Sequence, residues 1–265
     1  MCGRYANGRG STELADVFDA EPDEAAQGLA PAWNVAPTDA VAAVVIRRRR
    51  DGSHSDRAAG RPEGEPQRRL TVLRWGLVPS WAKDRRGAAR LINARLETVA
   101  EKPAFRRAFA ARRCLLPADG YYEWTAPAEG GRKQPWFVRP RDGSVLALAG
   151  LYEIWRDPAD PDAPLLWTST VLTTEAVDEA GRVHDRMPML VEPGAWATWL
   201  DPDLSDPEAL RGLLVPAAPG RLEAVPVSTE VNNVRSDGPE LVRPVALPSA
   251  GEPAVARLDD HPTLF

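Results

Sequence analysis

The hydrophobic positions of the chain fall into short runs separated by turn-forming residues. Val41 to Ile46 and Leu70 to Trp75 predict two buried strands. Six further runs predict strands over residues 113–118, 121–125, 135–139, 144–151, 165–172 and 222–227. Many short strands with few helices are typical of an α+β domain built on a curved or barrel-like sheet. We therefore expect a single domain with a mostly antiparallel, barrel-like sheet flanked by a few helices.

Helical periodicity first appears in two short segments of the front half. Residues 11–19 are expected to form a helix with Ser11 as its N-cap. The second helix is expected to begin with Pro103 at its first position and to end at Arg112. The inward-facing apolar residues of these two helices are predicted to be Leu14, Val17, Phe18, Phe105 and Phe109.

Two more helices are predicted in the second half of the chain. One begins near Pro193, because proline suits the first helical position. Its apolar residues are Trp196, Trp199 and Leu200. The other spans residues 206–214 and follows a Ser205…Glu208 capping box.

Two segments lack hydrophobic periodicity. Residues 51–69 are polar and rich in Gly, Pro and charge between closely flanking strands, so we expect a long, mobile loop inserted in a hairpin. Residues 248–265 are expected to be a loose tail, which leaves 2–247 as the domain. No run approaches the roughly 20 apolar residues of a membrane span. The N-terminus also lacks the hydrophobic stretch of a secretory signal.

The charge balance changes sign along the chain. The 265 residues carry a formal net charge of −5. Residues 1–141 hold 25 basic against 17 acidic side chains, whereas 142–265 hold 8 against 21. Residues 74–113 alone hold 11 basic against 3 acidic side chains, which indicates either a polyanionic partner or a solvated basic face. Thirty of the 33 basic residues are arginine, which suits phosphate but also fits a GC-rich genome.

The chain has two cysteines, too few for a disulfide framework or a zinc site. No cluster of His, Cys and Asp asks for a metal, and no cofactor is expected. The expected compartment is a reducing cytoplasm. Cys114 precedes two leucines and is expected to be a core thiol. Cys2 differs, because removal of Met1 would make it the N-terminal residue.

An N-terminal cysteine carries an α-amine and a thiol on adjacent carbons. Their unperturbed pKa values are about 7.7–8.0 and about 8.5, so both are partly nucleophilic near neutral pH. The amine condenses with an aldehyde to an imine, and the thiolate then closes a five-membered thiazolidine ring. An internal cysteine cannot do this. The alternative is that Cys2 is an incidental small residue.

Further polar residues lie in settings that suit chemistry. Asn93 follows an apolar pair and can orient an amine or thiol, and Arg95 is placed to hold a phosphate. Glu123 lies between aromatic residues on a predicted strand, where desolvation would raise its pKa. His184 is followed by an acidic and a basic residue, as in a proton shuttle. The alternative interpretations are a capped turn before a helix for Asn93 and Arg95, a surface glutamate for Glu123 and a structural histidine for His184.

Six motifs occur in order along the chain. They are MCGRY at residues 1–5, NVAP at 34–37, RWGLVP at 74–79, INARLET at 92–98, DGYYEW at 119–124 and HDRMP at 184–188. In this combination the sequence resembles the SOS response-associated peptidase (SRAP) family, from Cys2 to about Pro244. The loop at 51–69 looks like an insertion relative to shorter members, and the tail after residue 248 looks unmatched.

The resemblance implies an activity. Members of that family recognise abasic sites in single-stranded DNA and bond to them covalently, in the DNA damage (SOS) response. By resemblance Cys2 would be the nucleophile and Asn93 its positioning partner, with Glu123 and His184 as the acid–base pair. Met1 would be removed by autoproteolysis or by an aminopeptidase. The imine stage would permit weak abasic-site lyase activity.

The resemblance also implies which residues contact DNA. They are Arg4, Arg95 and Arg186 at phosphates, Trp81 and Pro37 as stacking surfaces, and Asn34 and Thr173 in the pocket. Some members have two adjacent tryptophans where this chain has Trp81-Ala82, so the wedge against a neighbouring duplex is expected to be weaker. We expect a monomer in the cytoplasm, associated with the nucleoid.

Two other interpretations stay open. An N-terminal-nucleophile amidohydrolase or cysteine peptidase would direct Cys2 at an amide carbonyl with His184 as base. Glutamine amidotransferases also begin with Met-Cys-Gly, although the sequence lacks their other signatures. A non-enzymatic single-stranded-DNA-binding module would use the basic segment and the aromatic residues, and Cys2 would be dispensable.

Overall fold

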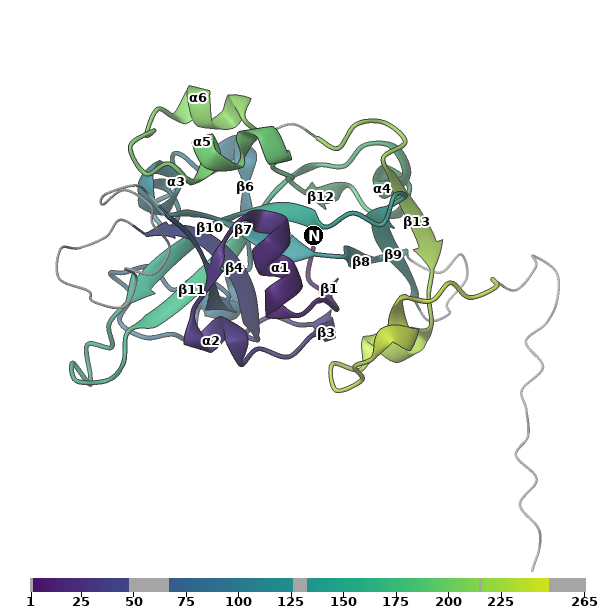
Figure 1. The fold of residues 1–265 in the computed structure, drawn as a ribbon, viewed down its shortest axis with the longest axis horizontal. Coiled ribbons are helices and arrows are strands. Elements are labelled where there is room, and N and C mark those ends of the chain that lie inside the picture. The colour runs from purple at the N-terminus through teal and green to yellow at the C-terminus, as the bar shows by residue number, and fades with distance from the viewer. Residues whose placement is uncertain (1, 48–66, 126–132, 215, 248–265) are drawn as a thin grey trace, which may run out of the picture.

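The computed structural model describes residues 2–47, 67–125, 133–214 and 216–247, and within them five strands close into a barrel. They are β4 (Ala40–Arg47), β5 (Gln67–Trp75), β7 (Arg113–Ala118), β10 (Leu146–Trp155) and β11 (Leu166–Glu175). Neighbours around the ring are antiparallel, except that β5 and β11 pair in parallel and close it. Figure 1 shows β4, β7, β10 and β11 of this barrel grouped together. The expected barrel-like, mostly antiparallel sheet is confirmed. The loop and tail predictions fall almost entirely outside the described residues, at 51–66 and 248–265.

The two faces of the barrel strands belong to different buried cores. Alternate residues of β4 divide between them, with Ala42 and Val44 in one and Val41, Ala43 and Val45 in the other. The first core includes residues of helices α1 (Ser11–Phe18), α3 (Arg106–Ala111) and α5 (Trp196–Leu200). The second includes Cys2 and Tyr121. A period of two is what a strand buried on both faces requires, and it places the N-terminal segment in the second core.

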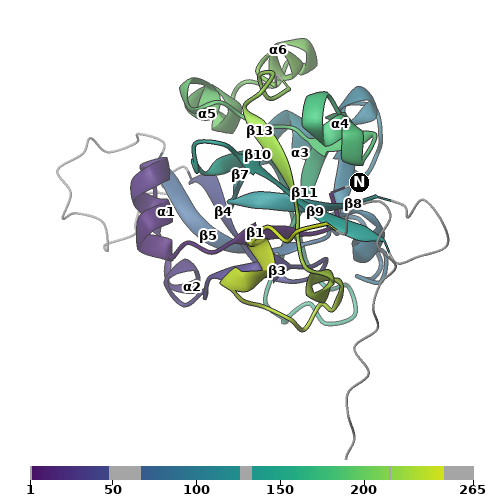
Figure 2. The ribbon, with the colours of Figure 1, turned by 90° about the vertical axis from the view of Figure 1, so that its right-hand side faces the viewer.

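A second sheet lies beside the barrel (Figure 2). Its strands, in spatial order, are β13 (Leu222–Pro226), β9 (Gln134–Pro140), β8 (Gly120–Thr125), β1 (Tyr5–Asn7) and β3 (Ala32–Val35). The chain passes from β7 into β8 with one residue between them, and Gly120 is needed there because a Cβ would lie 2.5 Å from the carbonyl oxygen of Val138. Since β1 pairs with β8, the N-terminal segment runs beside the DGYYEW motif.

The remaining elements are short. They are the strands β2 (Glu21–Pro22), β6 (Asn93–Arg95) and β12 (Arg186–Pro188), the helices α2 (Glu24–Gln27), α4 (Asp178–Val183) and α6 (Pro207–Gly212), and the 3₁₀ turns η2 (Ala88–Arg90), η3 (Leu96–Thr98), η4 (Pro193–Ala195), η5 (Thr229–Asn232) and η6 (Pro239–Val242). Both β6 and β12 pair with β11, so the INARLET and HDRMP motifs meet on one barrel strand. No helix within the described ranges is long and apolar enough to cross a membrane.

The predicted starts of two helices are wrong. Gly10, not Ser11, is the N-cap of α1, because its backbone is extended while its carbonyl accepts from the Leu14 N–H at 3.1 Å. Val17 is 40% exposed and does not join the buried face of that helix. Helix α3 begins at Arg106 rather than at Pro103, although its two phenylalanines are buried as predicted.

The predicted cap of helix α6 is also wrong. Asp206 is the N-cap, and its side chain accepts from the Ala209 N–H at 2.8 Å, so Ser205 does not form the expected capping box. The reason is Pro207. Proline favours the first helical position, which makes the residue before it the N-cap.

Candidate active site

Cys2 lies in the second core with no exposed surface. Its Sγ is 4.0 Å from the carbonyl oxygen of Arg4. Burial raises the pKa of this thiol well above its usual range, and the negative charge of Glu123 raises it further. The thiol is therefore protonated at neutral pH, and it needs a neighbouring base to become nucleophilic.

Asn93 fixes the backbone of Cys2. It is the first residue of β6 and is held by the parallel pairing of that strand with β11, opposite Val171. Its Nδ2 donates a 2.7 Å hydrogen bond to the Cys2 carbonyl oxygen. Its Oδ1 is buried and has no hydrogen-bond partner among the described residues. The amide thus anchors Cys2 with one end and keeps a buried acceptor at the other.

Glu123 lies on β8 and is only 3% exposed. This burial contradicts the surface-glutamate alternative. Burial also raises the pKa of the carboxyl to about 7, and the negative charge of Asp185 contributes in the same direction. Because both protonation states are populated near neutral pH, Glu123 can both accept and return a proton.

His184 follows helix α4 and is partly buried. Its Nδ1 accepts from the Arg186 backbone N–H at 3.0 Å and lies 2.7 Å from an Asp185 carboxylate oxygen. These two contacts exclude each other, because the first needs a bare Nδ1 and the second needs a proton there. Burial lowers the pKa of His184, which favours the neutral ring with its proton on Nε2. The imidazole can therefore donate through Nε2.

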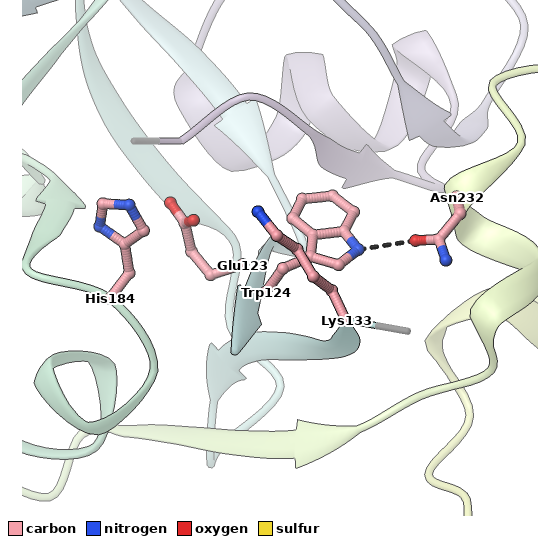
Figure 3. Close-up of a pocket in the computed structure, with 5 residues that line it drawn as sticks. All are labelled: Glu123, Trp124, Lys133, His184 and Asn232. Carbon is pink, nitrogen blue, oxygen red and sulfur yellow. Dashed lines mark hydrogen bonds between the residues drawn. The ribbon is translucent and has the colours of Figure 1, made fainter. Parts of the chain in front are cut away.

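Glu123 and His184 line one pocket of about 440 Å³, together with Trp124, Lys133 and Asn232. Figure 3 shows the Glu123 carboxylate between the His184 ring and the Lys133 side chain. On the side of the pocket away from His184, the Trp124 indole donates to the Asn232 side-chain oxygen at 2.7 Å (Figure 3). The pocket therefore offers a carboxyl, an imidazole and an ammonium group to a small polar ligand.

Lys133 and Asn232 belong to no motif, and sequence reasoning missed both. Lys133 immediately precedes β9, whose Gln134 lies opposite Thr125 at the end of β8. The sequence signal for Lys133 is the pair of predicted strands at 121–125 and 135–139, because a hairpin between them places Lys133 beside the end of β8. Asn232 arrives from η5, far along the chain, and only the tertiary fold brings it to the pocket.

Arg4 and Asn34 bond to each other rather than to solvent. Arg4 Nη1 donates to the Asn34 side-chain oxygen at 2.7 Å and to the Val231 carbonyl at 2.9 Å. Asn34 Nδ2 donates to the carbonyls of Asn233 and Ser236. The Arg4 guanidinium also lies 5.9 Å from the centre of a Trp124 ring, and burial lowers its pKa. These two residues attach the 231–236 segment to the wall of the pocket.

Arg186 is held in a two-pronged ion pair. Its guanidinium nitrogens lie 2.8 and 3.0 Å from the two carboxylate oxygens of Glu97. Arg186 also donates to the carbonyl of Thr173 at 2.7 Å, and Thr173 itself is buried. Hydrogen bonding to Arg186 lowers the pKa of Glu97. The pairing orients the guanidinium and partly neutralises it.

The remaining predicted DNA contacts lie outside this pocket. The Arg95 side chain is exposed, Trp81 is 60% exposed, and Pro37 is partly buried. Cys2, Asn93, Glu123 and His184 thus gather around the N-terminal segment, whereas these three residues do not line the pocket. No set of three or more His, Cys, Asp or Glu side chains suited to a metal ion occurs in the described part of the chain.

The fold and the site define a small α+β barrel protein with an acid–base pocket beside a buried cysteine close to its N-terminus. The sequence matches the family model "SOS response associated peptidase (SRAP)" over residues 1–234. The chain belongs to this family, as its motifs predicted.

Proteins with known names and structures agree with this assignment. The chain is 35% identical over 242 residues to Abasic site processing protein YoaM of Bacillus subtilis, covering 91% of this chain and 97% of that protein. It is 29% identical over 282 residues to Abasic site processing protein HMCES of Gallus gallus, covering 93% of this chain and 79% of that protein. A crystal structure from Bacteroides thetaiotaomicron matches with a TM-score of 0.72 at 22% identity, covering 92% and 100%. A crystal structure from Bordetella bronchiseptica matches with a TM-score of 0.65 at 25% identity, covering 86% of this chain and 100% of that chain. These structures confirm the fold.

Proposed function

We propose that this protein processes abasic sites in single-stranded DNA by forming a covalent crosslink through Cys2 after Met1 is removed. The names of its relatives support abasic sites as the substrate. The observation that carries the chemistry is the arrangement around Cys2. Asn93 anchors its backbone at 2.7 Å, and Glu123, with a pKa of about 7, lies close enough to raise the pKa of its thiol.

The reaction joins an aldehyde to an aminothiol. The Cys2 nitrogen adds to the aldehyde carbon of the open-chain abasic sugar, and the carbinolamine loses water to give an imine. The Cys2 sulfur then adds to the imine carbon. A C–S bond forms, the C=N π pair moves to nitrogen, and the thiol proton ends on that nitrogen. The product is a thiazolidine, formed with loss of one water and no change of oxidation state.

The surrounding groups fit these proton movements. Asn93 Oδ1, buried without a partner among the described residues, would accept from the Cys2 amine once Met1 is gone. Glu123 would take a proton from that amine and return it to the carbinolamine oxygen. His184 would help to open the sugar ring and protonate the departing oxygen through Nε2. A carbanion formed at the imine stage would lead to weak lyase activity.

The DNA is proposed to lie along the basic 74–113 segment. Arg95 and Trp81 are exposed enough to meet a phosphate and a base directly, and partly buried Pro37 is proposed as a further apolar surface. Arg186 would reach a phosphate by exchanging its Glu97 partner. Unstacked bases can stack on an exposed aromatic side chain such as Trp81, which favours single-stranded substrate.

Arg4, Asn34 and Thr173 are proposed to shape the pocket from behind it. Arg4 and Asn34 do so by holding the 231–236 segment, and Thr173 by orienting Arg186 through its carbonyl. The functional unit is proposed to be 2–247, acting as a monomer at damaged DNA during the SOS response. Removal of Met1 is proposed to be autocatalytic, as the family description suggests.

A denaturing gel with an abasic oligonucleotide tests this function. The wild-type protein is expected to give a band of lower mobility without added reductant, and Cys2→Ala is expected to lose it. Cys114→Ala is the matched control, because that buried thiol lies in the core. Binding without any covalent band would instead support a plain binding module. Turnover of an amide substrate without a DNA adduct would support the hydrolase.

A further inference from the structure

Tyr121 is a fully buried tyrosine beside the site, and its hydroxyl makes no hydrogen bond within the described part of the chain. It precedes Glu123 by two residues on β8, so the two side chains lie on the same face of that strand. The same buried core holds Tyr121 and Cys2. Tyr121 therefore shares a buried core with the thiol and a strand face with the carboxyl, and its backbone lies opposite Tyr5 of the N-terminal segment.

Leaving this hydroxyl unpaired destabilises the fold. A buried polar group without a partner lowers the stability of the folded state, whereas phenylalanine would fill the same space without that cost. The adjacent tyrosine shows the contrast. Tyr122 points to the opposite face, and its hydroxyl donates to the Trp33 carbonyl at 2.7 Å. Of the two neighbouring phenols, one is bonded to the fold and the other keeps its donor available at the site.

The surroundings of Tyr121 keep its proton in place. Burial raises the pKa of the phenol well above its usual value, and the charges of Cys2 and Glu123 act in the same direction. It therefore remains a neutral donor at neutral pH. A neutral donor beside a thiol stabilises the thiolate, because hydrogen bonds to charged acceptors are roughly twice as strong as neutral ones.

We propose that the Tyr121 hydroxyl donates to Cys2 Sγ as the sulfur becomes a thiolate, and so assists ring closure. This inference rests on the proposed crosslinking function. In the step concerned, Glu123 removes the thiol proton, and the sulfur lone pair attacks the imine carbon. The C=N π pair moves to nitrogen, and the proton passes from Glu123 to that nitrogen. Tyr121 keeps its own proton throughout and lowers the energy of the thiolate that forms in between.

Tyr121→Phe tests the proposed donation to Cys2 Sγ, because it removes only the phenol hydroxyl. Single-turnover reactions with an abasic oligonucleotide would be followed with and without borohydride, which traps the imine. Adducts stable without borohydride report ring closure, and borohydride-dependent adducts report the imine. Intact mass would first establish that Met1 is absent from every variant. We expect Tyr121→Phe to slow ring closure about tenfold while total trapping with borohydride stays at the wild-type level.

Two further readouts separate this role from a structural one. Because its imine persists, Tyr121→Phe is expected to increase strand cleavage by β-elimination. Its melting temperature is expected to equal or exceed that of the wild type. Tyr122→Phe is the matched control. It leaves the Trp33 carbonyl without its donor, so it should lower the melting temperature without changing the ratio of imine to ring-closed adduct.

The outcomes are distinguishable. If the wild-type protein forms no adduct, the proposed function itself fails. If the wild type crosslinks and Tyr121→Phe closes the ring at the same rate, the role of Tyr121 is overturned. It is equally overturned if the variant changes only the pH dependence of imine formation, because the hydroxyl would then act on Glu123 rather than on the sulfur.

Discussion

The side-chain nitrogen of Asn93 donates a 2.7 Å hydrogen bond to the backbone carbonyl of Cys2, joining residues 91 positions apart. The bond holds the N-terminal segment against β6 and hence against the barrel strand β11. It uses only one end of the amide, since Asn93 Oδ1 is buried without a partner among the described residues. Asn93 therefore fixes the backbone of Cys2, which we propose as the nucleophile, and keeps a buried acceptor that we propose for the Cys2 amine.

Asn93→Asp keeps the shape of the side chain but replaces the donor with an acceptor. We expect crosslinking of abasic DNA to slow by about 10- to 100-fold, the range that corresponds to losing roughly 1.5–3 kcal/mol of hydrogen bonding. Single-turnover gels measure the rate. Asn232→Asp makes the same charge change in the pocket while keeping the oxygen that accepts from Trp124, and should alter the rate much less. Equal losses in both variants would contradict the anchoring role.

Glu123 should make the folded state less stable as the pH rises. Its pKa is about 7 when folded and near 4.5 when unfolded, so the folded state binds the extra proton between these values. The stabilising effect is fully present below about pH 4.5 and is lost as the pH rises through 7. Chemical denaturation should find Glu123→Gln more stable than the wild type by roughly 3 kcal/mol at pH 8, with no difference near pH 4. Parallel pH curves for the two proteins would refute the raised pKa.

The same carboxyl should set the pH dependence of crosslinking. Glu123 must be ionised to take a proton from the Cys2 amine, so the rate is expected to fall as the pH drops below about 7. Initial rates between pH 5 and 8 provide the profile. Glu123→Gln should be slow throughout and lack this inflection. A variant that is slower but keeps the wild-type inflection would assign the titration to another group.

Hydrophobic patterning predicts most of the barrel strands. Where the prediction misses or shortens a strand, the cause is physical. The predicted strand at 144–151 continues to Trp155 because β10 stays paired with β11 as far as that residue. Glu153, a polar interruption in the pattern, is buried there in an ion pair with Arg112 at 2.5 Å. The short strands β6 and β12 have too few residues to show a period, and pairing with β11 creates them. Long-range pairing of this kind leaves little trace in a local sequence window.

The residues of the site also fall into two groups, those that sequence motifs indicate and those that only the tertiary fold brings there. Cys2, Asn93, Glu123 and His184 lie in compact motifs, and the fold brings these motifs close to one another. Lys133 and Asn232 lie in no motif, since a hairpin and a distant 3₁₀ turn deliver them. Nor does the sequence indicate that Arg4 is bonded to Asn34, or that Arg186 is bonded to Glu97. Those pairings depend on side-chain geometry across separate strands.

Glu97 should compete with DNA for Arg186. Neutralising it in Glu97→Gln removes the ion pair and frees the guanidinium for a phosphate. Non-covalent affinity for an intact single-stranded oligonucleotide is expected to rise about two- to fivefold, and the salt dependence to steepen by about one phosphate contact. Fluorescence anisotropy across a salt series measures both quantities.

Glu208→Gln on helix α6 is the control for that comparison. It also removes one negative charge and breaks an ion pair, with Arg211, but it lies on a surface helix outside the pocket. Equal gains in the two variants would mean that overall charge, and not the release of Arg186, governs binding.

Mass spectrometry of the crosslinked peptide identifies which atoms of the protein are bonded to the abasic sugar. After nuclease and trypsin digestion of the adduct, cleavage at Arg4 would release Cys2-Gly3-Arg4. We expect this tripeptide to lack Met1, to carry the abasic sugar with loss of one water, and to have both its amine and its thiol blocked. An adduct on Lys133, or an N-terminal peptide that retains Met1 or has a free Cys2 thiol, would contradict it.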